Sequence, residues 1–319
     1  MNTLGVDHGT KSIRFYVYPA EVSFEIDRKA MLQVSLLKEI EKHIALEDID
    51  LVGLTYSMGD GITKITDIKK VTNRGVLAFE TGGYIGGGTK VYDEIQGSGL
   101  DAVVIPGLHR RIEVLDPRFK ALYSHCASAE KVSLSYHACL ETGVENLIIA
   151  DISSNTVTIG IKNGKFFGAI DACLGAIGVF HGPLDLETIR RIDRGEISAN
   201  QAFYSSGAVK MYPESPGDIL EARNERAKLA LDSLILSAEM EILSFTGEIN
   251  PDAIVITGSF GIHEKIFSRL KKKLEEIAHV HRIDGYAAAK GSAEIARDIL
   301  NGKRDFLGID VDYAPTLYD

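Results

Sequence analysis

The sequence predicts an α/β protein whose two halves repeat one structural plan. Its 319 residues suffice for about two domains. Residues 4–18 and 147–161 share a strand–turn–strand pattern, and residues 50–60 and 252–261 share an apolar run that ends in a glycine and serine turn. Because both patterns recur in the same order, we expect a duplicated fold of mixed helices and strands.

The repeat divides the chain into an N-terminal lobe, residues 1–146, and a C-terminal lobe, residues 147–319. Residues 62–146 look like an insertion in the first lobe, with a strand at 102–105 and a helix at 129–142. No low-complexity linker separates the two lobes in the sequence. We therefore expect the lobes to abut, with a cleft between them.

Each copy of the first pattern is an apolar strand that ends in an aspartate, Asp7 or Asp151, followed by a turn of small polar residues. The two aspartates are 144 residues apart, about the length of one domain. Apolar and polar residues alternate after each turn, which is the period of a half-buried strand. A third strand follows at 22–26 in the first copy and, after the hairpin turn Lys162–Gly164, at 166–170 in the second.

Helical patterns precede both members of the second pair. Residues 28–44 and 218–246 carry apolar side chains at helical spacing, and such stripes normally face a protein core. The apolar runs that follow suit buried strands. Each half is therefore expected to contain antiparallel strands, then a helix, a strand and a helix.

Composition and charge disfavour several classes of protein. Lys and Arg number 35 and Asp and Glu 45, a net charge of −10 that disfavours non-specific nucleic-acid binding. The longest run without a charged residue, 172–184, is too short for a membrane helix. Residues 1–7 do not resemble a signal peptide, and three cysteines without CxxC spacing fit a reducing compartment. We expect a cytoplasmic protein without nucleic-acid or membrane partners.

The turns after Asp7 and Asp151 have the composition of phosphate-binding hairpins. A turn of small residues leaves backbone N–H groups free to point at phosphate oxygens, and hydroxyl groups add donors. A carboxylate at a strand end can hold Mg²⁺ directly or through water, so the two aspartates are the expected metal ligands. Two such hairpins facing each other would hold a triphosphate, whereas one alone would be only a turn with an aspartate cap. The expected phosphate ligands are Gly9, Thr10, Lys11 and Ser12 in the first turn and Ser153, Ser154 and Thr156 in the second.

The glycine turn at 257–261 is the expected nucleoside-binding element. A buried strand that runs into glycines lets the backbone approach a flat base or a ribose without an intervening Cβ. Gly258, Ser259 and Gly261 are the expected contacts. The alternative is an ordinary turn between a strand and a helix.

These elements together resemble the ATP-binding superfamily of acetate and sugar kinases, Hsp70 and actin. Residues 7–14 are similar to its first phosphate motif, residues 151–156 to its second, which here lacks the usual glycine, and residues 257–261 to its adenosine motif. The resemblance covers nearly the whole chain. It implies a duplicated ribonuclease H-like (actin-like ATPase) fold, two lobes with a central nucleotide cleft, and ATP and Mg²⁺ as cofactors.

Within this superfamily, the stretches 163–183, 249–260 and 287–293 are similar to butyrate and acetate kinases. Those kinases usually carry Asn at the position of Asp7, and their acid-binding arginines are not matched here. The chain as a whole resembles the archaeal family of methanogenesis marker protein 12. That resemblance implies a methanogen and an unassigned role.

Residues 82–90, GGYIGGGTK, nearly match a P-loop. That motif needs Lys directly after the last glycine, so that the ammonium group reaches the phosphates, but Thr89 precedes Lys90. A flexible loop is the favoured interpretation. A lid that closes over a bound nucleotide is the functional alternative.

Two aspartates and one basic cluster are further functional candidates. Asp60 and Asp116 could each serve as a general base if they faced the γ-phosphate. In the segment His109–Arg111, the adjacent guanidinium groups of Arg110 and Arg111 could hold an anionic substrate. A solvated loop is the favoured interpretation of this basic cluster.

Two other clusters of residues are better interpreted as structural than as functional. His125 and His137, with Cys126 and Cys139 beside them, could be read as metal ligands, but they lack the compact spacing of zinc sites. Buried structural residues fit them better. Lys271–Lys273, followed by glutamates, fits a solvated helix face.

Three classes of function fit this sequence: a kinase of a small carboxylate, a regulatory ATPase that acts on a protein, and an inactive homologue that binds nucleotide as a structural ligand or not at all. In the first two, catalysis rests on positioning and charge neutralisation, with Asp151 and Asp60 as the expected catalytic residues. The partners are then nucleotide and an unknown small-molecule or protein substrate, and the chain could form a homodimer. The altered second phosphate motif favours the last two classes.

Overall fold

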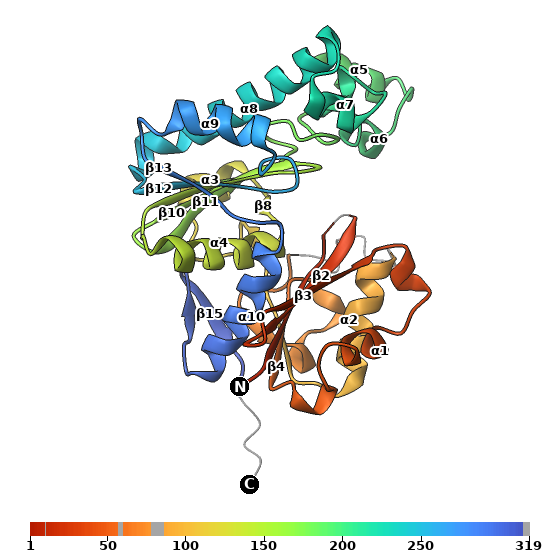
Figure 1. Ribbon diagram of the computed structural model, residues 1–319, viewed down its shortest axis with the longest axis vertical. Helices are drawn as coiled ribbons and strands as arrows, with labels where there is room; N and C mark the ends of the chain where they lie inside the picture. The colour runs from red at the N-terminus through yellow and green to blue at the C-terminus, as the bar shows by residue number, and fades with distance from the viewer. Residues whose placement is uncertain (10, 57–59, 78–85, 315–319) are drawn as a thin grey trace. The chain divides into compact units, whose positions relative to one another are not determined.

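The computed structural model describes residues 1–9, 11–56, 60–77 and 86–314 (Figure 1). Contacts within the chain separate two compact units. Among the described residues, no helix combines the length and the apolar character that a membrane crossing requires. Unit 1 comprises Met1–Glu141 and Tyr286–Asp319, and unit 2 comprises Thr142–Gly285.

Unit 1 is built on a mixed sheet that has eight strands among the described residues. β1 is antiparallel to β2 and parallel to β4, and β4 is parallel to β6. β1 and β4 are buried along their whole length, as their continuous apolar sequences require, while β2 is buried at every second residue. The sheet order is β14 (Asp305–Phe306), β15 (Ile309–Asp312), β5 (Ile65–Asp67), β6 (Ala102–Val104), β4 (Leu51–Leu54), β1 (Thr3–Asp7), β2 (Ser12–Tyr18) and β3 (Val22–Asp27), and a separate ribbon pairs β7 (Leu108–His109) with β8 (His125–Ala127).

Unit 2 is built on a smaller sheet, with five strands among the residues that the structure describes. β10 is antiparallel to β9 and β11, while β12 is parallel to β9 and β13. The turn between β10 and β11 uses Asn163 and Gly164 with φ of 52° and 70°, the left-handed backbone that a tight hairpin requires. The sheet order is β11 (Lys165–Ile170), β10 (Thr156–Lys162), β9 (Leu147–Ile152), β12 (Ala253–Thr257) and β13 (His279–Arg282).

The two sheets share one strand order, which confirms the predicted duplication. The order β3-β2-β1-β4-β6 in unit 1 corresponds to β11-β10-β9-β12-β13 in unit 2, with the same succession of antiparallel and parallel pairs. The carboxyl ends of the parallel strands therefore meet at one edge of each sheet. Open α/β sheets bind their ligands at this edge.

The helices follow the predicted apolar patterns with two differences. The pattern at 28–44 forms only a 3-10 turn and the short α1, because the backbone is extended directly before α1. The pattern at 218–246 is interrupted at Ala222, whose φ is 51°, and α8 then begins behind an Asn224 cap. The helix predicted at 129–142 is confirmed as α4. The α-helices are α1 (Leu36–Glu41), α2 (Gly87–Ser98), α3 (Pro117–Leu122), α4 (Ala129–Thr142), α5 (Leu186–Asp193), α6 (Ala199–Phe203), α7 (Pro216–Glu221), α8 (Glu225–Ile249), α9 (Glu264–Leu274) and α10 (Ala287–Leu300), and the 3-10 helices are η1 (Ala30–Leu32), η2 (Leu46–Asp48), η3 (Ile68–Lys70), η4 (Asn73–Gly75) and η5 (Ala208–Lys210).

The last helix returns to the first strands of the chain, as the blue and red ribbons of unit 1 show in Figure 1. α10 packs on β1, β2 and β4. This packing groups the chain from Tyr286 onward with unit 1, whereas the sequence predicts one C-terminal lobe over 147–319. An apolar helix face identifies a buried helix but does not identify the sheet that it covers.

α10 lies so close to β1, β4 and α4 that only glycine fits at the points of contact. A Cβ at Gly5 or Gly53, in the middle of β1 and β4, would overlap backbone carbonyls of α10. A Cβ at Gly291 of α10 would overlap the Ser133 carbonyl of α4. Backbone atoms cannot move aside as the end of a flexible side chain can. These glycines therefore set the spacing between α10, the sheet and α4.

Gly291→Ala is expected to lower the free energy of unfolding by about 1–3 kcal/mol, the usual cost of overpacking. Gly97→Ala is the matched control, because Gly97 is also helical and its added Cβ meets no atom within 4 Å. The control is expected to gain about 0.5–1 kcal/mol, since Gly is the weaker helix former. Urea unfolding curves measure both values. Equal effects of the two substitutions would contradict the close packing of α10.

Candidate functional site at the carboxyl edges of the two sheets

The first predicted phosphate turn begins where β1 ends, at Asp7. The strand register places Arg14 of β2 opposite Asp7 and Glu25 of β3 opposite Arg14. Arg14 Nη1 lies 3.6 Å from Asp7 Oδ2, and Arg14 Nε lies 3.5 Å from Glu25 Oε2. The Asp7 side chain is only 4% exposed. Arg14 therefore stabilises a carboxylate that burial alone would disfavour.

Arg28, which follows β3, holds the same turn in place. Its backbone N–H donates to the Lys11 carbonyl over 2.9 Å, and its Nη1 donates to the Gly9 carbonyl over 3.1 Å. The His8 N–H donates to Thr55 Oγ1, directly after β4, over 3.2 Å. The turn is thus anchored to two other segments of unit 1.

The expected ligands in this turn have different surroundings. Lys11 is exposed, whereas Ser12 Oγ donates to Glu25 Oε2 over 2.8 Å. Gly9 is required by the turn, because a Cβ there would lie 2.7 Å from the Ser12 carbonyl oxygen. Thr10 lies outside the described residues.

His8 adds no positive charge to the turn. Burial lowers the pKa of its imidazole to about 3, and the nearby Arg28 guanidinium acts in the same direction. The ring packs on Tyr56, with ring centroids 4.8 Å apart. The positive charge around the turn therefore comes from Lys11 and the two arginines.

The second predicted phosphate turn begins at the end of β9, where Asp151 is the last residue but one, and is joined to the glycine turn that follows β12. Ser153 Oγ donates to Asp151 Oδ1 over 2.7 Å and accepts the Ser259 N–H over 3.0 Å. The Ile152 carbonyl accepts two further N–H groups of the glycine turn. The structure thus brings together two motifs that lie about a hundred residues apart.

Gly258 makes this junction sterically possible. Its φ is 88°, a backbone conformation that favours glycine. An added Cβ would lie 2.6 Å from Ser153 Oγ and closer still to Asp151 Oδ1. Ser259, the next residue, is exposed beside the junction.

The loop at 171–183 supports the second turn. Its N–H groups donate to the Ser153 and Ser154 carbonyls over 2.9 to 3.1 Å. Thr156 is buried, and its Oγ1 donates to a carbonyl of this loop over 2.8 Å. The Thr156 hydroxyl, expected from the sequence to bind phosphate, thus forms an internal bond that stabilises the turn.

A buried glutamate of α8 holds the same loop. Glu241 Oε2 accepts the Ala176 N–H over 2.5 Å, and the residue is only 6% exposed. A Cβ at Gly175 would overlap Glu241 Oε2, so a side chain at this position would displace the carboxylate. Burial raises the pKa of the Glu241 carboxyl to about 7, against the opposite effect of the hydrogen bond from the Ala176 N–H. The group that anchors the loop therefore titrates near neutral pH.

The structure also brings Asp60, His109, Arg111 and His125 together in unit 1, and we call these four residues the Asp60 cluster. His125 Nδ1 lies 3.5 Å from Asp60 Oδ1, and Arg111 Nη1 donates to the Asp60 carbonyl over 3.2 Å. The pairing of β7 with β8 places His109 opposite His125. The sequence candidates of three separate segments thus form one polar cluster.

Within this cluster, His109 is buried and its contacts fit a neutral ring. Nε2 donates to the Ile62 carbonyl over 2.9 Å and Nδ1 accepts the Arg111 N–H over 3.3 Å, which assigns the Nε2–H tautomer. Burial lowers the pKa of His109. Burial would raise the pKa of Asp60, but the His125 hydrogen bond and neighbouring positive groups prevail and lower it. The expected solvated loop is wrong for His109, although Arg111 is exposed.

In the described part of the near match to a P-loop, Lys90 makes a structural contact. Lys90 Nζ donates to the Met31 and Val34 carbonyls over 3.1 and 2.5 Å, so its ammonium group holds the η1–α1 turn. Gly86–Gly88 cap and begin α2. Residues 82–85 lie outside the described residues, and a lid over the nucleotide stays a prediction.

Two further sequence candidates make structural contacts. Asp116 caps the N-terminus of α3 by accepting the Arg118 N–H over 2.8 Å. His137 Nδ1 of α4 lies 3.0 Å from Glu294 Oε2 of α10, and Cys126 is buried in β8. The contact between His137 and Glu294 joins α4 to α10 within unit 1.

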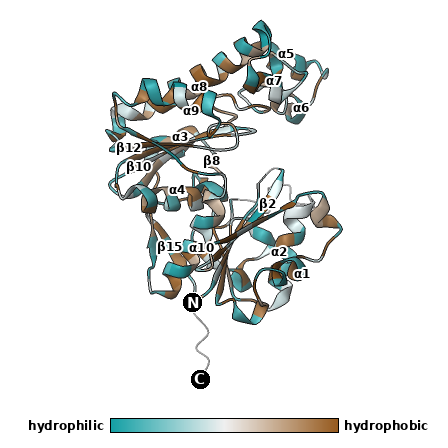
Figure 2. Cartoon of the chain, in the orientation of Figure 1, coloured by the Kyte–Doolittle hydropathy of each residue, from teal (hydrophilic) through white to brown (hydrophobic). Residues whose placement is uncertain are grey.

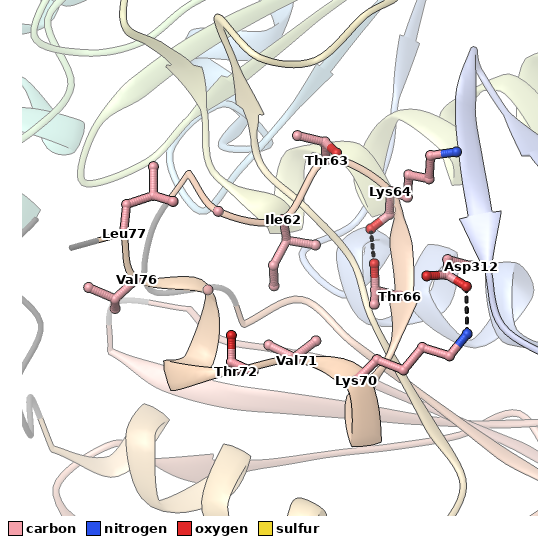
Figure 3. A pocket seen from close by; sticks show the side chains of 12 residues that line it. Ile62, Thr63, Lys64, Thr66, Lys70, Val71, Thr72, Val76, Leu77 and Asp312 are labelled. Atoms are coloured by element: carbon pink, nitrogen blue, oxygen red, sulfur yellow. Dashed lines mark hydrogen bonds and ion pairs between the residues drawn. The ribbon is translucent and has the colours of Figure 1, made fainter. Parts of the chain in front are cut away.

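A small pocket of about 270 Å³ begins at Gly61, directly after Asp60 in the chain (Figure 3). Ile62 and Val71 give it apolar walls, as Figure 3 shows. Lys70 at the pocket pairs with Asp312 of β15 over 2.6 Å, so its charge is neutralised. The pocket therefore suits a small, mostly uncharged group better than a phosphate.

The donor chemistry of the two turns fits Mg²⁺ and phosphate. Asp7 and Asp151 supply carboxylate oxygens at or next to strand ends, and the Ser153 hydroxyl lies 2.7 Å from Asp151 Oδ1. Across the described part of the chain, no three His, Cys, Asp or Glu side chains form a group that could hold a metal ion. This arrangement fits Mg²⁺, which keeps several waters and shares its ligands with substrate phosphates.

Comparison with known proteins identifies the family. No protein-family model matches the chain. A UPF0285 protein of Methanocaldococcus jannaschii is 51% identical over 329 residues, which cover 98% of this chain and 100% of that protein. The chain belongs to the UPF0285 family. A UPF0285 protein of Methanothermobacter thermautotrophicus is 45% identical, with 97% of this chain and 98% of that protein covered.

Solved structures of low sequence identity share the fold of this UPF0285 chain. Acetate kinase of Porphyromonas gingivalis matches with a TM-score of 0.66 at 14% identity, covering 94% of this chain and 99% of the kinase. A propionate kinase of Francisella tularensis matches with a TM-score of 0.66 at 16% identity, covering 93% and 99%. A ROK family glucokinase of Streptomyces griseus matches with 0.53 at 16% identity, covering 93% and 100%. These matches confirm the predicted duplicated actin-like ATPase fold.

Four residues that shape the site in this UPF0285 chain are not predicted from the sequence. Arg14 belongs to the first phosphate motif, and the hairpin register could have identified it as the partner of Asp7. The other three residues are remote in sequence from the turn or loop that each one holds; they are Arg28, Thr55 and Glu241. No local pattern signals such contacts.

Glu241→Gln is expected to remove a pH dependence of stability. The folded-state pKa of about 7 lies above the ordinary 4.5, so the folded wild type holds a proton that the unfolded chain loses. Its free energy of unfolding should therefore fall by about 3 kcal/mol as pH rises from 4.5 to 7, and then level off. Gln mimics the protonated acid and should not show this fall.

Urea unfolding of the wild type, Glu241→Gln and the exposed control Glu276→Gln at several pH values measures the effect. The Glu241 variant should match the wild type at pH 4.5 and exceed it above pH 7, while the control should follow the wild type throughout. A constant difference across this range would contradict the raised pKa.

Proposed function

We propose that this UPF0285 protein binds Mg-ATP and acts as an ATPase or phosphotransferase. The junction in unit 2, where Gly258 joins the adenosine-motif turn to the Asp151–Ser153 turn, is the observation that carries the proposal. Unit 1 repeats the strand plan, with Asp7 at the corresponding strand end. The glucokinase that shares this fold was solved with glucose and AMPPNP, which supports a nucleotide as the ligand.

The proposal gives each turn a role toward Mg-ATP. Asp7 and Asp151 hold the hydrated Mg²⁺, which neutralises phosphate charge when it is bound. Residues 9–12 and 153–154 donate hydrogen bonds to phosphate oxygens, and residues 258–261 lie against the adenosine. Because both turns are already anchored within the protein, little backbone ordering would oppose binding.

The Asp60 cluster is the proposed position of the phosphoryl acceptor. Asp60 follows β4 and His109 follows β6, so the cluster belongs to the same carboxyl edge as Asp7. The exposed Arg111 would bind an anionic group of the acceptor. Asp60 and Asp151 are the proposed catalytic residues, and the lowered pKa of Asp60 suits a carboxylate that orients the acceptor by accepting its hydrogen bond.

A second candidate is a catalytically inactive nucleotide-binding or structural protein that acts through a protein partner. The internal bonding of the second turn favours it, because the Ser153 and Thr156 hydroxyls already donate within the protein. The resemblance to methanogenesis marker protein 12 and the organisms of the relatives support a methanogenesis-associated role, in an archaeal cytoplasm, for either candidate.

Gly258→Ala is expected to weaken Mg-ATP binding at least tenfold, a loss of about 1.4 kcal/mol. The added Cβ would push apart the Asp151–Ser153 turn and the adenosine-motif turn. Gly195→Ala is the matched control, because Gly195 also has a positive φ, 72°, but its added Cβ meets no atom within 4 Å. Calorimetric titration measures binding, with circular dichroism to verify folding. No binding by the folded wild type, or equal binding by all three proteins, would contradict the proposal.

Turnover separates the two candidates. A kinase should release ADP faster when its small acid is added, and a regulatory ATPase should do so when its protein partner is added. Binding of Mg-ATP without phosphate or ADP release under either condition would favour the inactive nucleotide-binding candidate. A coupled ADP assay with the wild type and Asp60→Asn makes the measurement, and loss of turnover with retained nucleotide binding is the result expected of this variant.

A further inference from the structure

Helix α8 is apolar on two opposite faces. One face packs on β9 and β10 and is buried. The other face carries Leu229, Leu236, Met240 and Leu243, which are 58%, 54%, 63% and 40% exposed. Figure 2 shows hydrophobic residues recurring along this helix. Contiguous exposed apolar residues mark interaction sites more often than scattered ones do.

The four exposed residues have the spacing of a coiled-coil seam. Leu229, Leu236 and Leu243 are seven residues apart, and Met240 lies four residues after Leu236. On a helix of 3.6 residues per turn, all four fall within a sector of about 60°. This is the a and d pattern of a heptad. We call the a and d positions between Leu229 and Gly247, residues 229, 233, 236, 240, 243 and 247, the outer seam.

α9 lies beside α8 without covering the outer seam. Arg269 Nη1 of α9 lies 2.7 Å from Asp232 Oδ1, and Lys273 of α9 pairs with Glu239. These two acids flank the seam on one side. Because α9 neutralises them, another helix could approach the seam without strong repulsion between like charges.

We propose that the outer seam is the interface of a homodimer. The α8 helices of two copies pack antiparallel across a two-fold axis level with Ala238, one residue from the middle of the helix. A two-fold interface must be complementary to itself, and the outer seam has that property.

Side-chain sizes match across this axis. In the antiparallel register, the a positions of one helix face the d positions of the other. Large residues then meet small or flexible ones, so the two helices can pack without voids or overlap. The facing pairs are Leu236 with Met240, Leu243 with Ser233, and Leu229 with Gly247, where the second residue of each pair belongs to the second copy.

Charges at the helix ends favour the same orientation. The first turn of α8 holds Arg226 and Lys228 with one acid, Glu225, and its last turn holds Glu248. The antiparallel arrangement brings the basic end of each helix level with the acidic end of the other, and it opposes the two helix dipoles. A parallel arrangement would place like charges together. A second copy of this chain is therefore the occupant that the seam fits.

The mass in solution tests the proposal. The wild type should sediment at twice its chain mass of 34.8 kDa at micromolar concentration. Leu236→Arg combined with Met240→Lys should sediment as a monomer, because it buries like charges at the axis, with the far-UV circular dichroism and melting temperature preserved. Leu122→Arg is the matched control, since Leu122 is 70% exposed on α3, and it should stay dimeric.

A monomeric wild type would overturn the proposal. The outer seam would then be a surface for a different partner. A dimer that survives the double substitution would place the interface elsewhere and would also overturn it.

Cross-linking tests the orientation in a Cys173→Ser background, which removes the exposed native thiol. Ser237→Cys should form a disulfide-linked dimer under mild oxidation, because residue 237 lies near the axis. Gly247→Cys should not, because its two copies would lie about 27 Å apart at a rise of 1.5 Å per residue. Cross-linking at both positions would indicate parallel helices and contradict the proposed register.

Discussion

The close approach of α10 to β1 and β4 is the constraint on which the rest of the structure depends. Gly5 and Gly53 leave no side chain between the strands and the helix, and Gly291 does the same between α10 and α4. The last helix of the chain thereby fixes the first strand. The end of β1 carries Asp7, so the position of the first phosphate turn depends on a helix nearly 280 residues away in the sequence.

The same logic applies at both carboxyl edges, where remote residues hold short turns. Arg28 holds the turn after β1, and Glu241, through the loop at 171–183, supports the turn after β9. A site built on turns binds well when other parts of the fold restrict those turns beforehand. The support from Glu241 depends on pH. A buried carboxyl with a pKa of about 7 is mostly protonated below neutral pH and mostly ionised above it.

The sequence predicts the features that local pattern encodes. Strands with Asp7 and Asp151 at or next to their ends repeat a recognisable plan. Asn163 and Gly164 are typical of the tight turn that they form. The comparison with solved kinases confirms the fold inferred from these patterns. The roles of the individual site residues stay predictions.

Features that depend on packing between distant elements are not visible in the sequence. Ala222 ends α7 in a left-handed conformation that no local rule assigns to alanine. Likewise, nothing local shows that α10 joins unit 1 or that Asp60 and His125 lie 3.5 Å apart. These arrangements arise from burial and register, which involve residues far apart along the chain.

Hydrogen exchange of the whole chain with and without Mg-ATP tests the central claim most directly, because it reports on both turns separately. Binding should slow exchange in peptides that cover residues 7–14, 151–156 and 257–262, and should leave those over α5 and α6 unchanged. Protection in unit 2 alone would contradict the role of Asp7. No protection in any of these peptides at saturating Mg-ATP would contradict nucleotide binding at the carboxyl edges altogether.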